Sequence, residues 1–156
     1  PDRRGSTRRR PWHASPLISV VLLLDTCAAV WLANGDSMSR RSLAVIRAAT
    51  SRGEVFVSPV SAWEIGLLAA NPKSGVVFSP SPQAWFAALL AQPGVQLAPL
   101  TPEAAIESSF LPGEIHGDPA DRLLVATARC MPASLVTRDG RLLEYGAAGH
   151  VRVVAC

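Results

Sequence analysis

The sequence contains few of the residues on which several common kinds of site depend. Its three cysteines, Cys27, Cys130 and Cys156, are far apart and form no C-x-x-C pair. Neither a zinc site nor a disulfide framework is therefore predicted. No glycine-rich loop that could cradle a phosphate group is present. The only lysine is Lys73, which is misplaced for a phosphate-accepting receiver domain.

Long hydrophobic runs are also absent. No stretch of about 20 apolar residues occurs, so no membrane-spanning helix and no membrane association are expected. The cysteine pattern favours a reducing compartment, and we expect the cytoplasm. A secretion signal is the alternative, because Arg8-Arg9-Arg10 precedes apolar residues between Leu17 and Leu24. Asp25 interrupts that run, and cleavage after it would remove a predicted strand, so we do not expect export.

The net charge of +3 is unevenly distributed along the 156 residues. Residues 1–20 hold five of the 15 basic residues and one of the 12 acidic residues, so the remainder is close to neutral. The predicted folded part therefore has no strong basic field that would by itself indicate nucleic-acid binding. We expect a disordered basic tail over residues 1–16 and one domain over residues 17–156.

Short apolar runs alternate with helical patterns along this domain. The run Val20–Leu24 shows no period-2 alternation, which is typical of a strand buried on both faces. Further strands are predicted at 55–57, 95–98, 134–137 and 151–154, and helices at 27–33, 37–51, 58–70, 81–91, 101–110, 118–130 and 140–145. The alternation predicts an α/β fold with a parallel sheet that is covered on both faces.

Several acidic residues lie at the ends of these predicted elements. Asp25 ends the first strand and Asp139 follows the fourth. In parallel α/β sheets, ligands bind beyond the carboxyl ends of the strands. Asp118 and Asp121 open the helix that leads into the fourth strand. Glu64 lies nearly two turns into the helix after the second strand, from where its side chain can point back over the same edge.

Each acid also has a purely structural interpretation. Asp118 and Asp121 match the N-cap and third residue of a helix, and Asp139 matches the cap of the helix after it. The segment Ser61–Glu64 matches a capping box if its helix begins later than Ser58. Only Asp25 is expected to cap nothing, because it ends a fully apolar strand.

Taken together, the acids favour a metal site. Carboxylates gathered at one edge repel one another unless a cation lies between them. Oxygen ligands without paired histidine or cysteine select Mg²⁺ or Mn²⁺. Such an ion polarises a phosphodiester and lowers the pKa of a bound water, which then attacks in line. The set predicts hydrolysis of a nucleic-acid backbone or of another phosphate ester.

Four ordered segments resemble the motifs of PIN-domain ribonucleases, especially the VapC-type toxins of bacterial toxin–antitoxin pairs. They are Leu24–Thr26, Ser58–Ile65, His116–Ala128 and Val136–Asp139, and Asp-Pro-x-Asp-Arg in the third is the most specific. The resemblance covers about residues 20–154. It implies a three-layer α/β/α sandwich with a PIN-like five-stranded parallel sheet in the order 3-2-1-4-5.

The resemblance also implies roles for individual residues. The carboxylates that would hold Mg²⁺, with Mn²⁺ as an alternative, and carry catalysis are Asp25, Glu64, Asp121 and Asp139. Of these, Asp139 resembles a fourth, more variable acid. Asp118 resembles an accessory acid at the edge of the site, although we favour its capping role. The hydroxyls of Thr26 and Thr137 would orient carboxylates or waters.

The function implied is that of a metal-dependent endoribonuclease, the toxin of a toxin–antitoxin pair. RNA would be its substrate, an antitoxin protein its partner, and a homodimer its assembly. The alternative is a catalytically inactive PIN-like domain that binds RNA or a protein. Apolar side chains that could form an antitoxin or dimer groove, although core packing is expected for most, are Trp63, Ile65, Leu67, Leu68, Trp85, Phe86 and Leu89.

Basic residues around the predicted site are harder to place. Arg122 either pairs with an acid or faces the substrate. His116 could contact RNA, but a single histidine in a bend is expected to be an ordinary surface residue. Arginines that could grip phosphate, with no predicted arrangement, are Arg40, Arg41, Arg47, Arg129 and Arg141.

Overall fold

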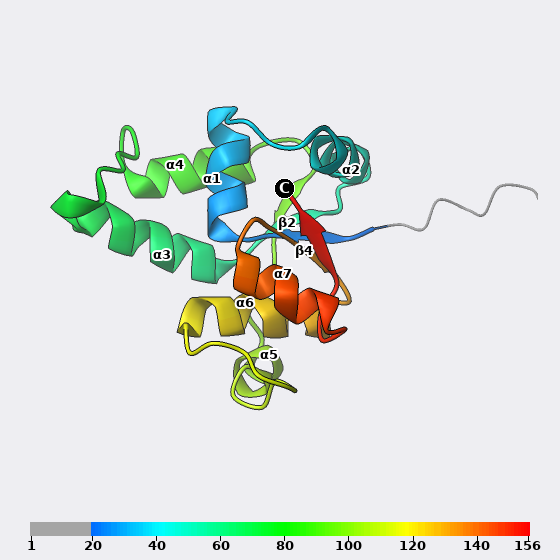
Figure 1. The fold of residues 1–156 in the computed structure, drawn as a ribbon. Helices are drawn as coiled ribbons and strands as arrows, with labels where there is room; N and C mark the ends of the chain where they lie inside the picture. The colour runs from blue at the N-terminus through cyan, green and yellow to red at the C-terminus, as the bar shows by residue number, and fades with distance from the viewer. Residues whose placement is uncertain (1–19) are drawn as a thin grey trace, which may run out of the picture.

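The computed structural model describes residues 20–156 and contains one parallel sheet (Figure 1). The predicted basic tail, residues 1–16, lies outside the described residues. The strands follow the order β3-β2-β1-β4-β5, which confirms the predicted topology. They are β1 (Leu22–Leu24), β2 (Val55–Val57), β3 (Val95–Leu97), β4 (Ser134–Thr137) and β5 (Val153–Ala155).

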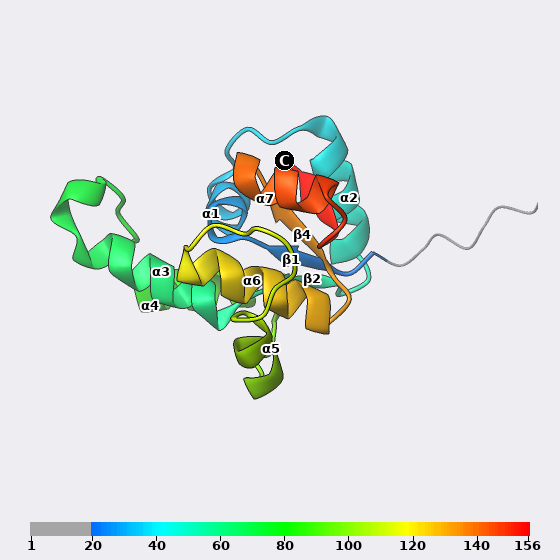
Figure 2. The same cartoon turned by 60° about the horizontal axis from the view of Figure 1, so that its bottom comes forward.

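Helices cover both faces of the sheet, as the sequence predicts. They are α1 (Thr26–Asn34), α2 (Arg40–Thr50), α3 (Pro59–Ala70), α4 (Pro82–Leu90), α5 (Pro102–Glu107), α6 (Pro119–Cys130) and α7 (Gly140–Ala147), with a short 3₁₀ turn, η1 (Pro72–Ser74), after α3. Figures 1 and 2 show α1 and α2 on one side of the strands and α5 and α6 on the other. None of the helices in residues 20–156 is long and apolar enough to cross a membrane.

The central strand β1 supplies both apolar cores. Successive side chains of a strand point to opposite faces. Leu22 and Leu24 accordingly pack with α1, α2 and α4, and Leu23 packs with α6 and α7. All three leucines are 0% exposed, which explains the unbroken apolar run. The register pairs Leu24 with Val57 of β2 and Val136 of β4, so these three strands end at the same edge.

Helix starts are specified by short polar side chains followed by proline. Ser58, Ser81, Thr101 and Asp118 are the N-caps of α3, α4, α5 and α6, and each precedes a proline at the first helical position. Such side chains satisfy free backbone N–H groups, and proline has no N–H to satisfy there. Because Ser58 caps α3, the capping-box interpretation of Ser61–Glu64 is wrong, and Glu64 lies in the second turn of the helix.

Two further boundaries differ from the prediction. Helix α2 begins at Arg40 because the Ser39 side chain accepts a hydrogen bond from the Ser42 N–H at 3.1 Å. Helix α1 begins immediately after Asp25, without a loop. Helix α3 extends beyond the sheet and forms an arm with α4, in which Phe78 packs edge-on against Trp85 at 5.2 Å (Figure 1).

Candidate metal centre at the carboxyl edge of the sheet

Asp25 lies where β1 passes directly into α1, and it is 6% exposed. Its Oδ1 accepts a hydrogen bond from the Ala28 N–H at 2.6 Å, so Asp25 is the N-cap of α1. The expectation that Asp25 caps nothing is therefore wrong. Burial raises the pKa of its carboxyl group, whereas hydrogen bonds from Thr137 and Ala28 lower it. These bonds offset part of the cost of keeping a buried carboxylate ionised.

Glu64 reaches the same edge from α3. The Thr26 hydroxyl donates to Glu64 Oε2 and also lies 3.0 Å from the buried Ser61 hydroxyl. Burial raises the pKa of Glu64 most, the Thr26 hydrogen bond lowers it, and the charges of Asp118 and Asp25 raise it further. The structure thus brings Glu64 and Asp25 within range of each other's charge.

Helix α6 brings two acids that do different things. Asp118 caps the helix, because its Oδ1 accepts from the N–H groups of Ala120 at 2.9 Å and Asp121 at 3.1 Å. The Asp121 side chain makes no such cap. Burial raises its pKa to about 7, with further contributions from the charges of Asp118, Asp139, Glu64 and Asp25. One carboxyl group therefore senses all four other acids that the sequence singles out.

His116 folds over the first turn of α6 and reaches Asp121. Its Nδ1 lies 3.4 Å from the Asp118 N–H, which donates to it, and its Nε2 lies 3.2 Å from Asp121 Oδ2. The side chain is only 16% exposed, so the expectation of an ordinary surface histidine is wrong. The separation of two residues between His116 and the cap Asp118 is the sequence signal that could have indicated this contact.

The end of β4 contributes Thr137 and Asp139. Thr137 is 0% exposed, its hydroxyl contacts Asp25, and its Oγ1 accepts from the Asp139 N–H at 3.0 Å. Asp139 is exposed and caps α7 through the N–H groups of Arg141 and Leu142 at 2.8 and 3.0 Å. Thr137 therefore connects the ends of β1 and β4.

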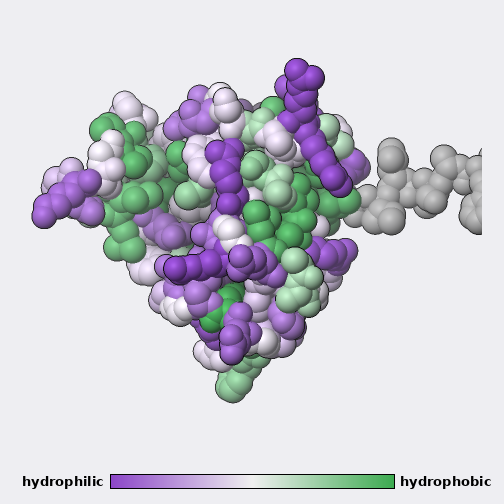
Figure 3. Space-filling model, in the orientation of Figure 1, coloured by the Kyte–Doolittle hydropathy of each residue, from purple (hydrophilic) through white to green (hydrophobic). Residues whose placement is uncertain are grey.

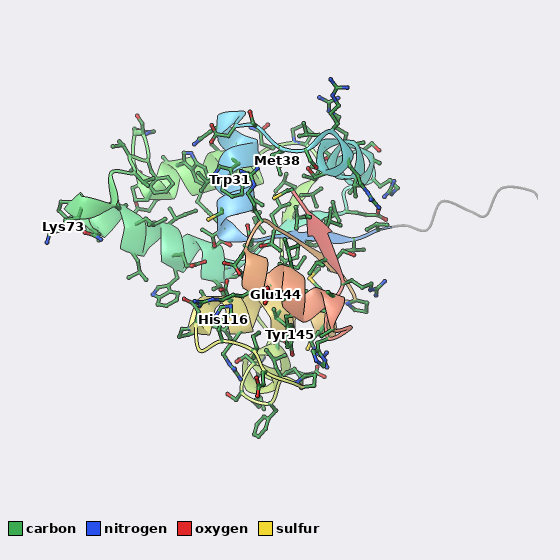
Figure 4. All side chains as sticks on the ribbon, viewed as in Figure 1. Trp31, Met38, Lys73, His116, Glu144 and Tyr145 are labelled. Atoms are coloured by element: carbon green, nitrogen blue, oxygen red, sulfur yellow. The ribbon has the colours of Figure 1, made fainter. Side chains whose placement is uncertain are left out.

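Arg138 is a neighbour of the site that sequence reasoning did not single out. Its Nε donates to the Cys156 carbonyl at 3.0 Å, and its guanidinium donates to the Ser37 carbonyl at 2.8 Å. The guanidinium also lies 4.0 Å from the centre of the Trp31 ring (Trp31 is labelled in Figure 4). Arg138 thereby ties the α1–α2 connection to the end of β4, and its charge contributes to lowering the pKa of Asp25.

The remaining predicted arginines separate clearly. Arg129 pairs with Glu107 at 3.3 Å, and Arg122 Nε donates to the Ser108 carbonyl at 2.9 Å rather than to an acid. Arg141 lies in the first turn of α7, next to Asp139. The other three, Arg40, Arg41 and Arg47, belong to α2 on the opposite side of the sheet from α6.

The chemistry of this donor set fits a hard divalent cation. Asp25, Glu64, Asp121 and Asp139 offer oxygen ligands, and the raised pKa values of the first three reflect burial and mutual repulsion that a cation relieves. Within residues 20–156, no three His, Cys, Asp or Glu side chains are already arranged as a metal site. Glu64 is instead held by Thr26, and Asp121 lies beside His116. Binding an ion would require these carboxylates to draw together.

Comparison with known proteins identifies relatives of this arrangement. The sequence profile of the PIN domain family matches residues 22–148. Ribonuclease VapC22 of Mycobacterium tuberculosis is 32% identical over 124 residues, which cover 80% of this chain and 91% of VapC22.

Solved structures share the fold at much lower identity. VapBC2 of Rickettsia felis, bound to a DNA fragment from its promoter, matches with a TM-score of 0.62 at 15% identity, over 86% of this chain and 97% of that chain. DNA-bound VapBC of Salmonella typhimurium matches with a TM-score of 0.60 at 16% identity, over 87% and 98% of the two chains. At these identities the two structures establish likeness of fold alone.

Proposed function

The chain belongs to the PIN domain family, and we propose that it is a metal-dependent endoribonuclease, the toxin of a toxin–antitoxin pair. The observation that carries this proposal is the meeting of Asp25, Glu64 and Asp121 at the carboxyl edge of the sheet, each with a raised pKa. Acids held together against their own repulsion are typical of functional sites. The identity to a ribonuclease over most of the chain supports RNA as the substrate.

In the proposed mechanism, Asp25, Glu64 and Asp121 would hold one Mg²⁺ ion, with Asp139 as a fourth acid. When bound, the ion supplies Lewis-acid polarisation of the scissile phosphate and an acidified water as nucleophile. Mn²⁺ has the same preference for oxygen ligands and is the alternative.

The protein's own part is to keep these carboxylates ionised and oriented. Thr137 and the Ala28 N–H donate to Asp25, and Thr26 donates to Glu64, and these hydrogen bonds lower the pKa values that burial raises. His116 contacts Asp121 from behind the first turn of α6. Outer contacts of this kind fix the direction of a ligand and tune its affinity for a metal.

An antitoxin protein is the proposed partner, and a homodimer the proposed assembly. The VapBC structures with the same fold support a partner of this kind. Trp63 and Leu67 on α3 are 52% and 53% exposed, whereas Ile65 and Leu89 are buried in the core. Figure 3 shows hydrophobic side chains over the α3–α4 arm. Exposed apolar side chains on one element suit a protein contact.

We also propose the cytoplasm as the compartment in which the chain acts. Cys27, Cys130 and Cys156 are all free thiols. Free thiols persist in reducing compartments, where disulfides are rare.

The proposal is tested by cleavage of a mixed, end-labelled RNA pool by the purified chain. Cutting should occur with Mg²⁺, stop with EDTA, and be lost in Asp25→Asn. Circular dichroism should show that this variant keeps its fold, because asparagine can accept the same cap hydrogen bond as Asp25. Unchanged growth toxicity of the variant would instead support the alternative function, a PIN-like domain that binds RNA or a protein without cutting.

A further inference from the structure

A groove next to the acidic edge has no assigned role. It has a volume of about 770 Å³ and runs between α7 and the segment from Leu111 to His116, with the start of α6 at its side. The charged and aromatic side chains that line it are His116, Arg122, Arg141, Glu144, Tyr145 and His150. His116 belongs to both places, since its Nε2 lies 3.2 Å from Asp121 Oδ2. The groove therefore begins where the proposed metal centre ends.

We infer that this groove receives one nucleotide of the RNA beside the scissile phosphate, and that Arg141 contacts its phosphate. The inference deepens the proposed function and rests on it. A groove of this volume is within the range of small-molecule sites, so a single nucleotide fits it.

One face of α7 forms a wall of the groove. Arg141, Glu144, Tyr145 and Ala148 are spaced as i, i+3, i+4 and i+7, which places them in a row along the helix axis. Figure 4 shows Glu144 and Tyr145 on α7, with His116 on the facing segment. Because Asp139 caps α7, Arg141 lies in the turn nearest the acids. An RNA strand that crosses the acids would meet Arg141 first.

The walls of the groove are held in place by internal hydrogen bonds. The Tyr145 hydroxyl donates to the Pro112 carbonyl at 2.5 Å, and its ring packs against His150 with centroids 4.7 Å apart. Arg122 Nε donates to the Ser108 carbonyl. A groove with fixed walls needs less ordering when a ligand binds.

Arg141 differs from the other arginines on its side of the sheet. Arg122, Arg129 and Arg138 all use their guanidinium groups on protein acceptors. Among the described residues, the Arg141 guanidinium has no hydrogen-bond or ion-pair partner. Guanidinium groups match phosphate oxygens in geometry and charge, so this group is available for the RNA backbone.

Glu144 opposes this charge one turn further along α7. Figure 3 shows hydrophilic side chains across the middle of this face, where α6 and α7 lie in Figure 1. A carboxylate beside the arginine repels a second phosphate, so the groove suits one phosphate rather than a long basic track. This opposition gives the inference a test in which two neighbouring substitutions act in opposite directions.

The experiment measures binding of a fluorescein-labelled pool of random single-stranded 12-mer RNA to the full chain. Fluorescence anisotropy is recorded with Mg²⁺ between 50 and 200 mM salt, and Asp25→Asn is present throughout to prevent cutting. Arg141→Ala should weaken binding by about tenfold and lower the slope of log affinity against log salt by about 0.7, the value for one phosphate contact on a single strand. Glu144→Gln should tighten binding by about twofold to threefold.

The matched control is Arg41→Ala, which removes one exposed arginine from α2 on the other side of the sheet. It should leave the affinity unchanged. Equal effects of Arg141→Ala and Arg41→Ala, in a chain whose Asp25 form cuts RNA, would overturn the groove assignment alone. Failure of the Asp25 form to cut and of the Asp25→Asn form to bind would overturn the proposed function and the groove assignment with it.

Discussion

The ends of β1 and β4 are neighbours with the same local order: a buried strand, an acid and a helix. Asp25 and Asp139 both accept hydrogen bonds from the N–H groups of the helix that follows. Asp25 is 6% exposed and its pKa is raised by burial, whereas Asp139 is exposed to solvent. The difference arises because α1 follows Asp25 directly, and Arg138 separates Asp139 from the end of β4.

This contrast shows that capping a helix and holding a metal do not exclude each other. Asp25 uses one oxygen for the Ala28 N–H and remains close enough to Glu64 to raise its pKa. Asp118 and Asp121 repeat the contrast within one helix, since Asp118 caps α6 and Asp121 points its carboxyl group toward the other acids. Burial and neighbouring charge, rather than capping, separate the site acids from the structural ones.

Asp25→Asn should have the largest effect and would define one end of the contrast. Losing a buried ligand charge should lower RNA cleavage by about three orders of magnitude. Asp139→Asn, which changes an exposed acid in the same way, should lower cleavage by about tenfold. Single-turnover cleavage at saturating Mg²⁺ measures both. Equal losses would mean that exposure does not separate the two acids.

His116→Ala should have the next largest effect. His116 contacts Asp121 from outside the predicted ligand set, so its loss should weaken Mg²⁺ affinity about 10-fold to 100-fold. The Mg²⁺ dependence of cleavage measures this, with Arg41→Ala as the matched surface control. The contact would be irrelevant if His116→Ala left the Mg²⁺ dependence unchanged.

Asp121 should make the cation-free chain less stable as the pH rises. Its pKa in the folded chain is about 7, above its ordinary value of 3.8, so the folded state favours the protonated form. The stability from this group is complete below pH 3.8 and is lost as the pH rises from about 4 to about 7. Allowing for solvent screening, the loss should be about 2 kcal/mol.

Denaturant unfolding in EDTA at pH 5 and pH 8 tests this sign. Asp121→Asn should be more stable than the parent at pH 8 and should depend less on pH. Some pH dependence should persist in the variant, because the pKa values of Asp25 and Glu64 are raised in the same direction. A variant that is less stable than the parent at pH 8 would contradict the account.

The smallest expected effect concerns Asp139 as a cap. Asp139→Ala removes the acceptor for two N–H groups and should lower the free energy of unfolding by about 1 kcal/mol. Asp139→Asn should cost almost nothing, because asparagine is an equally good cap. Thermal unfolding of the two variants side by side gives the comparison, and equal losses would argue against the cap.

Local patterns predicted the fold well where they depend on neighbouring residues. The unbroken apolar run before Asp25 predicted a central buried strand, and serine, threonine or aspartate before proline predicted four helix starts. The cap made by Asp25 was missed because a strand that passes into a helix without a loop leaves no turn signal. Thr26 gave no sign that a helix had begun, since β-branched residues are more common in strands.

Contacts between distant segments could not be predicted in the same way. The guanidinium of Arg138 reaches the Ser37 carbonyl across a sequence separation of 101 residues. The Thr26 hydroxyl meets Glu64 only because α1 and α3 lie together at the edge of the sheet. The meeting of the acids at one edge followed from topology, but which of them are buried depended on side-chain packing that the sequence pattern does not encode.

The most direct test of the central claim is to locate Mn²⁺ in crystals of the full chain by anomalous diffraction. We predict one peak at the carboxyl edge of the sheet, with carboxylate oxygens of Asp25 and Asp121 within about 2.3 Å. The peak should be absent from crystals of Asp25→Asn. Saturating Mn²⁺ that leaves this edge empty in the parent chain, or binds elsewhere with these acids unliganded, would contradict the account.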